Sequence, residues 1–180
     1  VQATVDLDTQ HPGDYRNGGV KLRGSGAYYP ELWDVESAFG VVEADAIGYL
    51  PLGRATPALR AGGKKVFGTY PFREAAYLGG QSTIRGYRIN RFAGDSALYG
   101  NAELRLTLGR AFILLPGEFG IFALADAGRV YLDGEDSDRW HAGFGGGIFF
   151  AVLSRSTVFS LSVARSDEHT SVLLGSGFWF

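Results

Sequence analysis

The sequence has 180 residues, with 27 Gly, 3 Trp, 9 Tyr, 13 Phe, no Cys and a formal net charge of −2. Its longest apolar run is far shorter than the roughly 20 residues that a membrane-spanning helix needs, which excludes a helical membrane protein. Positive and negative side chains are mixed along the chain and form no basic patch, so the composition does not indicate nucleic-acid binding.

Eight segments of strand length alternate apolar with polar or small side chains. In residues 19–29, for example, Val20 and Leu22 share one face while Lys21 and Arg23 share the other. Such alternation is typical of strands with one face toward lipid and one toward the interior of a barrel. In chain order, the predicted strands are residues 19–29, 38–50, 59–68, 98–108, 119–132, 141–153, 158–165 and 172–180.

The stretch between the third and fourth of these strands, about residues 69–96, is too long for an ordinary hairpin, whose loop has about 2 to 5 residues. The two strands after this stretch place acidic side chains on their polar faces, Glu103 in residues 98–108 and Asp126 in residues 119–132. These carboxylates are therefore expected on the inner wall of successive strands.

The last ten residues alternate apolar and small side chains and end on an aromatic residue, as a final outer-membrane strand does. In this register Val172, Leu174, Phe178 and Phe180 share one face, which we expect to contact lipid.

Together these patterns predict an all-β fold, a transmembrane antiparallel up-and-down β-barrel of eight strands over residues 19–180. An even strand number lets the first and last strands close antiparallel, whereas a ninth strand at residues 1–7 would make the closing seam parallel. Residues 1–18 are therefore interpreted as an N-terminal extension or a strand stub. A soluble β-sandwich is the alternative fold.

Four motifs occur in an order that resembles the outer-membrane protein 85 superfamily, which includes barrel-assembly, two-partner secretion and chloroplast import barrels. Ile84-Arg85-Gly86-Tyr87 is similar to the superfamily motif (V/L/I)RG(F/Y), found in a long extracellular loop that folds into the lumen. Asn101-Ala102-Glu103-Leu104-Arg105 and Ala125-Asp126-Ala127-Gly128 are similar to the next two strands, and the aromatic C-terminus to the insertion signal. The resemblance covers about residues 4–180 and implies the C-terminal half of a sixteen-stranded barrel, without POTRA domains.

The resemblance implies that residues 69–96 form this lumenal loop and that Glu103 and Asp126 bind Arg85. A guanidinium in a narrow barrel must find anions, because an unpaired buried charge costs several kcal/mol. The alternative is a solvated Arg85, with the two carboxylates facing Lys21, Arg23 and Arg105. An eight-stranded lumen is nearly filled by its own side chains, so the loop caps the mouth, or two chains share a larger barrel, or the chain is a fragment. A closed monomer with the loop partly inserted is favoured, and a dimer is the alternative.

The function implied by the resemblance is non-enzymatic: insertion or translocation of polypeptides in the bacterial outer membrane. The implied partners are outer-membrane lipid, the barrel-assembly machinery through the C-terminal strand, and client polypeptides. The alternative is a structural or anchor barrel, or the membrane module of a periplasmic enzyme, without transport. No cofactor or metal is expected, since His11, His141 and His169 lack metal-ligand spacing and no catalytic motif is present.

Overall fold

The computed structural model describes residues 1–9, 15, 18–31, 37–112, 115–135, 138–152, 157–178 and 180. Within these ranges, nine antiparallel strands form one sheet in the order β1-β2-β3-β4-β7-β8-β9-β10-β11, and β5 and β6 pair separately. The bounds are β1 Gln2–Asp8, β2 Gly19–Tyr29, β3 Phe39–Tyr49, β4 Ala55–Gly68, β5 Ala76–Leu78, β6 Phe92–Gly94, β7 Ser96–Phe112, β8 Pro116–Tyr131, β9 His141–Val152, β10 Thr157–Arg165 and β11 Thr170–Ser176. The predicted all-β, up-and-down antiparallel fold is confirmed.

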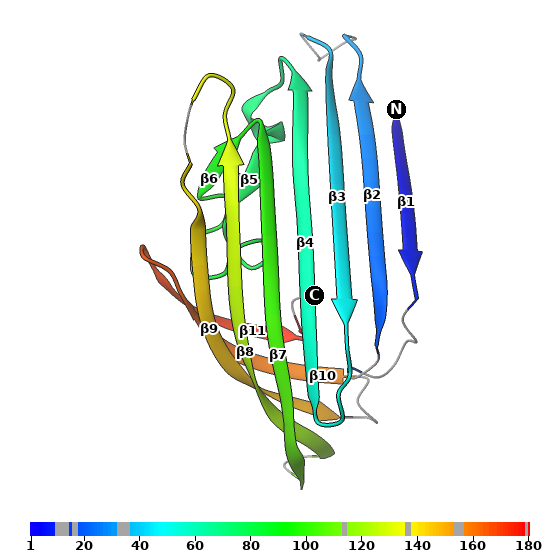
Figure 1. Cartoon of the computed structure of the whole chain (residues 1–180), viewed down its shortest axis with the longest axis vertical. Helices are drawn as coiled ribbons and strands as arrows, with labels where there is room; N and C mark the ends of the chain where they lie inside the picture. Colours follow the sequence, from blue (N-terminus) through cyan, green and yellow to red (C-terminus); the bar gives the residue numbers. More distant parts are fainter. Residues whose placement is uncertain are drawn as a thin grey trace.

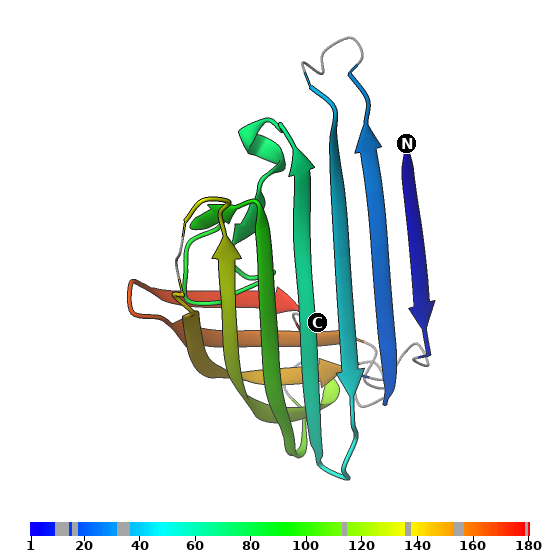
Figure 2. The same ribbon diagram turned by 45° about the horizontal axis from the view of Figure 1, so that its top comes forward.

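The sheet curls toward its C-terminal end. Strands β1 to β4 and β7 run side by side, whereas β9 bends and β10 and β11 cross behind β4 and β7 (Figures 1 and 2). The hairpin of β5 and β6 lies on the concave side of this curl (Figure 2). The sheet therefore has a convex outer face and a concave inner face.

Side chains alternate between these two faces as their chemistry predicts. On β7, Leu104 is 52% exposed on the convex face, while Glu103 and Arg105 are each 3% exposed on the concave face. On β8, Ile121 is exposed and Asp126 is buried. The convex face is therefore apolar and unpartnered, and the concave face carries the ions.

The N-terminal residues form a strand, which corrects the expected strand number. Strand β1 pairs with β2 along its whole length, and its inward carboxylates bind β2 cations, with Arg23 Nη2 2.8 Å from Asp6 Oδ2 and Lys21 Nζ 3.4 Å from Asp8 Oδ2. In the described ranges, the large sheet thus has nine strands rather than eight. Because nine alternating strands leave β1 and β11 running in the same direction, they cannot close antiparallel, and no pairing between them occurs in the described residues.

The C-terminal residues also depart from the expected register. Val172 and Leu174 are 70% and 77% exposed on the convex face. Strand β11 ends at Ser176, however, and Gly177 has a φ of +109°, which only glycine adopts easily. The chain turns there, and Phe178 packs in the interior against Phe122 and Phe149. The expectation that Phe178 and Phe180 face lipid is wrong, because the alternation stops where the strand stops.

Helical structure contributes little to the described chain. The 3₁₀ turn η1 (Phe72–Glu74) precedes β5. No described helix has the length and apolar character needed to cross a membrane.

Candidate functional site: an inner loop held by buried charges

The segment between β4 and β7 folds into the concave side of the sheet. Residues 79–91, which connect β5 to β6 and are called the inner loop below, contain a fully buried Ile84, and Arg85 and Tyr87 are 1% and 3% exposed. Ile84 packs in an apolar cluster with Leu78 and Ala97. The tip of this loop is therefore part of the packed interior.

Hydrogen bonds tie the backbone of the inner loop to strands on both sides. From β7, Asn101 Nδ2 donates to the carbonyl oxygen of Thr83 at 2.6 Å. Beyond the end of β10, Ser166 Oγ donates to the carbonyl oxygen of Gly86 at 2.9 Å. On β9, Gly143 lies so close that a Cβ there would collide with the Arg85 carbonyl oxygen. The loop backbone is thus held between β7, β9 and the turn after β10.

The Arg85 guanidinium binds carboxylates from two successive strands. Its Nε donates to Asp126 Oδ2 at 2.7 Å and its Nη2 to Asp126 Oδ1 at 2.6 Å, which is a bidentate pair. The Arg85 backbone N–H donates to Asp126 Oδ2 at 2.9 Å, and Nη1 donates to Glu103 Oε1. Asn101 Nδ2 donates to Asp126 Oδ1 at 2.8 Å. One arginine therefore links the loop tip to β7 and β8.

Burial makes this pairing obligatory. The Arg85 side chain is 1% exposed, and those of Glu103 and Asp126 are 0% exposed. Burial alone would lower the pKa of Arg85, but the hydrogen bonds and charge of Asp126, followed by those of Glu103, raise it above its ordinary value. Arg85 is therefore a permanent cation, and removing one member would leave an uncompensated buried charge.

A second arginine shares the same carboxylate. Arg105 Nε and Nη2 donate to Glu103 Oε2 at 2.9 Å and 2.8 Å, while Glu103 Oε1 accepts from Arg85. The two arginines and two carboxylates, Arg85, Glu103, Arg105 and Asp126, are called the charge cluster below. Its formal charges cancel.

Tyr87 ties the inner loop to the turn between β10 and β11. Its hydroxyl donates to Asp167 Oδ1 at 2.5 Å. Its ring makes edge contacts with Phe92 and His141, whose rings stack at 3.6 Å between centroids. Close by, Arg91 Nε donates to Glu168 Oε2 at 2.6 Å. The loop is thus fastened at its surface side as well as at its buried tip.

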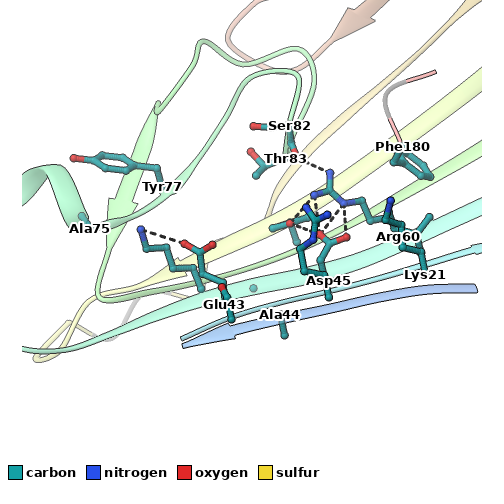
Figure 3. A pocket seen from close by; sticks show the side chains of 16 residues that line it. Lys21, Glu43, Ala44, Asp45, Arg60, Ala75, Tyr77, Ser82, Thr83 and Phe180 are labelled. Carbon is teal, nitrogen blue, oxygen red and sulfur yellow. Dashed lines mark hydrogen bonds and ion pairs between the residues drawn. The ribbon is translucent and has the colours of Figure 1, made fainter. Parts of the chain in front are cut away.

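Polar space remains between the inner loop and strands β2 to β4 (Figure 3). The cavity measures about 530 Å³. Arg60 Nε donates to Asp45 Oδ2 at 2.8 Å and Arg60 Nη1 to the Ser82 carbonyl oxygen at 2.8 Å, while Lys64 lies 3.5 Å from Glu43. Its charged lining residues are Lys21, Arg23, Glu43, Asp45, Arg60 and Lys64. The lining therefore carries four cations and two carboxylates. The two cations without a partner in the lining, Lys21 and Arg23, bind Asp8 and Asp6 of β1.

The structure brings together most of the residues singled out from the sequence. Ile84, Arg85, Gly86 and Tyr87 all lie in the inner loop, and Arg85 contacts Glu103 and Asp126. The residues expected to share the lipid face, Val172, Leu174, Phe178 and Phe180, do not all lie on one face. Val172 and Leu174 face outward, whereas Phe178 packs in the interior.

Three participants were missed as site residues: Arg105, Asn101 and Ser166. Arg105 and Asn101 each lie two residues from Glu103 on the same face of β7, which is a signal that could have identified them. In the described ranges, no group of three His, Asp or Glu side chains could hold a metal ion.

Residues 69–150, just under half of the chain, match the family described as haemolysin secretion/activation protein ShlB/FhaC/HecB. No curated protein matches the chain. The matched range contains the inner loop and all four members of the charge cluster. The match supports a related outer-membrane translocator barrel, and the family is one of secretion proteins rather than enzymes.

Replacing Arg85 by Gln should expose the inner loop. The change leaves Asp126 buried without its bidentate partner, and breaking such a pair costs about 3–5 kcal/mol. We expect easier unfolding in urea and faster cleavage of the loop by proteinase K, with loss of heat-modifiable gel mobility at a lower temperature. The matched control is Arg91→Gln, whose side chain is 47% exposed and whose ion pair should contribute about 0–1 kcal/mol. Equal behaviour of the two variants would contradict the importance of the buried pair.

Replacing Gly143 by Ala should displace the loop without changing any charge. A Cβ at position 143 collides with the Arg85 carbonyl oxygen, whereas a Cβ at Gly24 on β2 meets no atom within 4 Å. Overpacking of this kind typically costs about 1–3 kcal/mol. We expect Gly143→Ala to lower the urea midpoint and Gly24→Ala to leave it unchanged. The close approach is refuted if both variants unfold at the wild-type midpoint.

The Tyr87–Asp167 contact should depend on pH at both extremes. Burial and the hydrogen bond to Asp167 raise the pKa of Tyr87 to about 12, and the same bond lowers the pKa of Asp167. The contact therefore contributes fully between the ordinary pKa values of about 4 for Asp and 10 for Tyr. It is lost as pH rises through 12, or falls through the lowered Asp167 value. Tyrosinate absorbance of the wild type minus that of Tyr87→Phe should titrate near pH 12. A difference titrating near the ordinary tyrosine pKa of about 10 contradicts the contact.

Proposed function

We propose that this chain is the membrane-embedded module of an outer-membrane barrel that secretes or translocates polypeptides, and that the inner loop controls passage along its concave side. The observation that carries the proposal is the fully buried Arg85, which fastens the loop tip to carboxylates of β7 and β8. A loop fastened by ions rather than by apolar packing alone can be released when water reaches those ions.

The convex face supports a membrane location. Leu104, Phe144 and Ile148 are 52%, 64% and 58% exposed there. Such a wide apolar surface suits contact with the lipid of the bacterial outer membrane. Strand β11 would carry the signal for the barrel-assembly machinery on its outward residues Val172 and Leu174. We propose no catalytic role, cofactor or metal.

The cavity beside the inner loop supports the choice of a polypeptide as cargo. Its walls pair Arg60 and Lys64 of β4 with Asp45 and Glu43 of β3, and Lys21 and Arg23 of β2 add further cations, so the cavity presents both signs of charge to anything that enters. An extended polypeptide with mixed side chains suits such a surface better than an ion of one sign does. Displacement of the inner loop would widen this space into a path.

One observation favours an anchor barrel without transport as a second candidate. The rings of Tyr15, Phe149 and Phe178 contact one another, with centroid distances of 5.2 to 5.9 Å, and Phe122 contacts Phe178. This aromatic cluster fills part of the interior. An anchor barrel can keep its interior filled, because no polypeptide has to pass through it.

Polypeptide release from vesicles should separate the two functions. Lipid vesicles that carry the chain are loaded with an unfolded, dye-labelled polypeptide. We expect the variant Asp126→Asn, which loosens Arg85, to release it several-fold faster than the wild type. The control Asp138→Asn, which alters a 99% exposed side chain, should not differ from wild type. Release at the rate of protein-free vesicles from all three proteins would refute translocation and favour the anchor. In a separate assay, an unfolded barrel protein is added to the vesicles. Faster folding of this protein than in protein-free vesicles would indicate an insertion function instead.

A further inference from the structure

We infer that Arg105 is a positioning residue that holds the C-terminal segment across the concave side of the sheet, and that Glu103 couples this segment to the inner loop. The C-terminal segment is defined here as Gly177, Phe178 and Phe180. The inference goes beyond the proposed function, because it concerns a different part of the chain and can be tested without any transported polypeptide.

Arg105 makes the contacts that fix the far end of this segment. Its Nη2 donates to the Phe180 carbonyl oxygen at 2.8 Å, and its guanidinium lies 3.8 Å from the centroid of the Phe178 ring. The side chain of Arg105 is 3% exposed, so both contacts form away from water, where they are strongest.

The near end of the segment is tied to a different wall. The Gly177 N–H donates to the Val158 carbonyl oxygen at 2.7 Å, and Ser160 Oγ donates to the Gly177 carbonyl oxygen at 2.7 Å. Val158 and Ser160 belong to β10, whereas Arg105 belongs to β7, and β8 and β9 lie between them in the sheet. The segment therefore crosses the concave side from one wall to another, with Gly177 as its pivot.

Glu103 connects the C-terminal segment, called the strap below, to the inner loop. One of its oxygens accepts from Arg85 in the loop, and the other accepts from Arg105 beneath the strap. Movement of either guanidinium changes how the shared carboxylate is held, so the two elements bias each other reciprocally. Release of the inner loop should loosen the strap, and release of the strap should loosen the loop.

The position of the strap gives this coupling a consequence. Phe180 lines the same cavity as Ser82 and Thr83 of the inner loop (Figure 3). The Phe178 ring contacts the aromatic cluster. Loop and strap therefore border the interior space together, and their joint departure would enlarge it more than either movement alone.

The rate of digestion by carboxypeptidase, measured by mass spectrometry of the intact protein, reports how freely the C-terminal segment leaves the interior. In the folded full chain, we expect Arg105→Gln to speed the loss of terminal residues by roughly tenfold or more, since a charge-assisted hydrogen bond and a cation–π contact are both lost. The control on the same strand is Arg110→Gln, whose side chain is 83% exposed, and it should digest at the wild-type rate. Arg105→Lys keeps the charge but not the planar fork and should fall between wild type and Arg105→Gln. If Arg105→Gln is folded, as judged by heat-modifiable gel mobility, and is digested at the wild-type rate, the inference that Arg105 holds the strap is wrong.

The coupling is tested by combining changes. Arg85→Gln should also speed digestion, because it loosens Glu103 and removes the Arg85 guanidinium from the Phe180 ring, whose centroid is 5.7 Å away. It should add little in the Arg105→Gln background. If the increase in digestion rate of the double variant equals the product of the increases of the two single variants, the coupling through Glu103 is wrong, whereas the role of Arg105 in holding the strap still stands.

A variant that keeps every charge covers the case in which Arg105→Gln does not fold. Phe178→Leu removes the ring beneath the guanidinium and should speed digestion several-fold, whereas Phe159→Leu alters a ring that is 53% exposed on the convex face and should not. Equal digestion of these two variants would overturn the strap as well.

Discussion

The charge cluster buries four charged side chains on the concave side of the sheet, and the inner loop and the C-terminal segment both contact it. No side chain of the charge cluster is more than 3% exposed, so each ion must find its partner within the protein. The cluster requires β7 and β8 in the register that places Asn101 opposite Asp126, and it requires the inner loop to be folded in. A slip of one residue would turn Glu103 toward the convex face. The ions thus specify both the strand register and the loop position.

Alternation along the strands made the inner and outer residues of β7 and β8 predictable, including Glu103 and Asp126. The sequence did not reveal two features that depend on where alternation begins and ends. Strand β1 was missed because an odd strand number is incompatible with a closed antiparallel barrel, and the described sheet leaves β1 and β11 unpaired to each other. Phe178 was misplaced because counting alternate residues assumes that the strand continues past Gly177. The contact of Arg105 with Phe180 joins positions 75 residues apart, which no local pattern encodes.

The match to secretion proteins and the C-terminal strap concern different parts of the chain. Residues 69–150 include the charge cluster and end within β9, so β10, β11 and the C-terminal segment lie outside the match. Arg105 belongs to the matched range but contacts Phe178 and Phe180 outside it. The pairing of Arg85 with its carboxylates and the holding of the C-terminal segment therefore meet at Glu103, which binds both arginines, and at the Phe180 ring, which lies 5.7 Å from the Arg85 guanidinium.

The same geometry indicates where opening would begin. Pulling Arg85 out alone would leave Asp126 buried with the Asn101 amide as a remaining partner, which is unfavourable unless water arrives first. Asn101 Oδ1 is buried without a hydrogen-bond partner in the described structure, and Asn101 Nδ2 bonds the carbonyl oxygen of Thr83. Thr83 lines the polar cavity. Water entering from that cavity would reach Thr83, then Asn101 and then Asp126. Hydration from the β2 to β4 side would thus lower the cost of freeing Arg85.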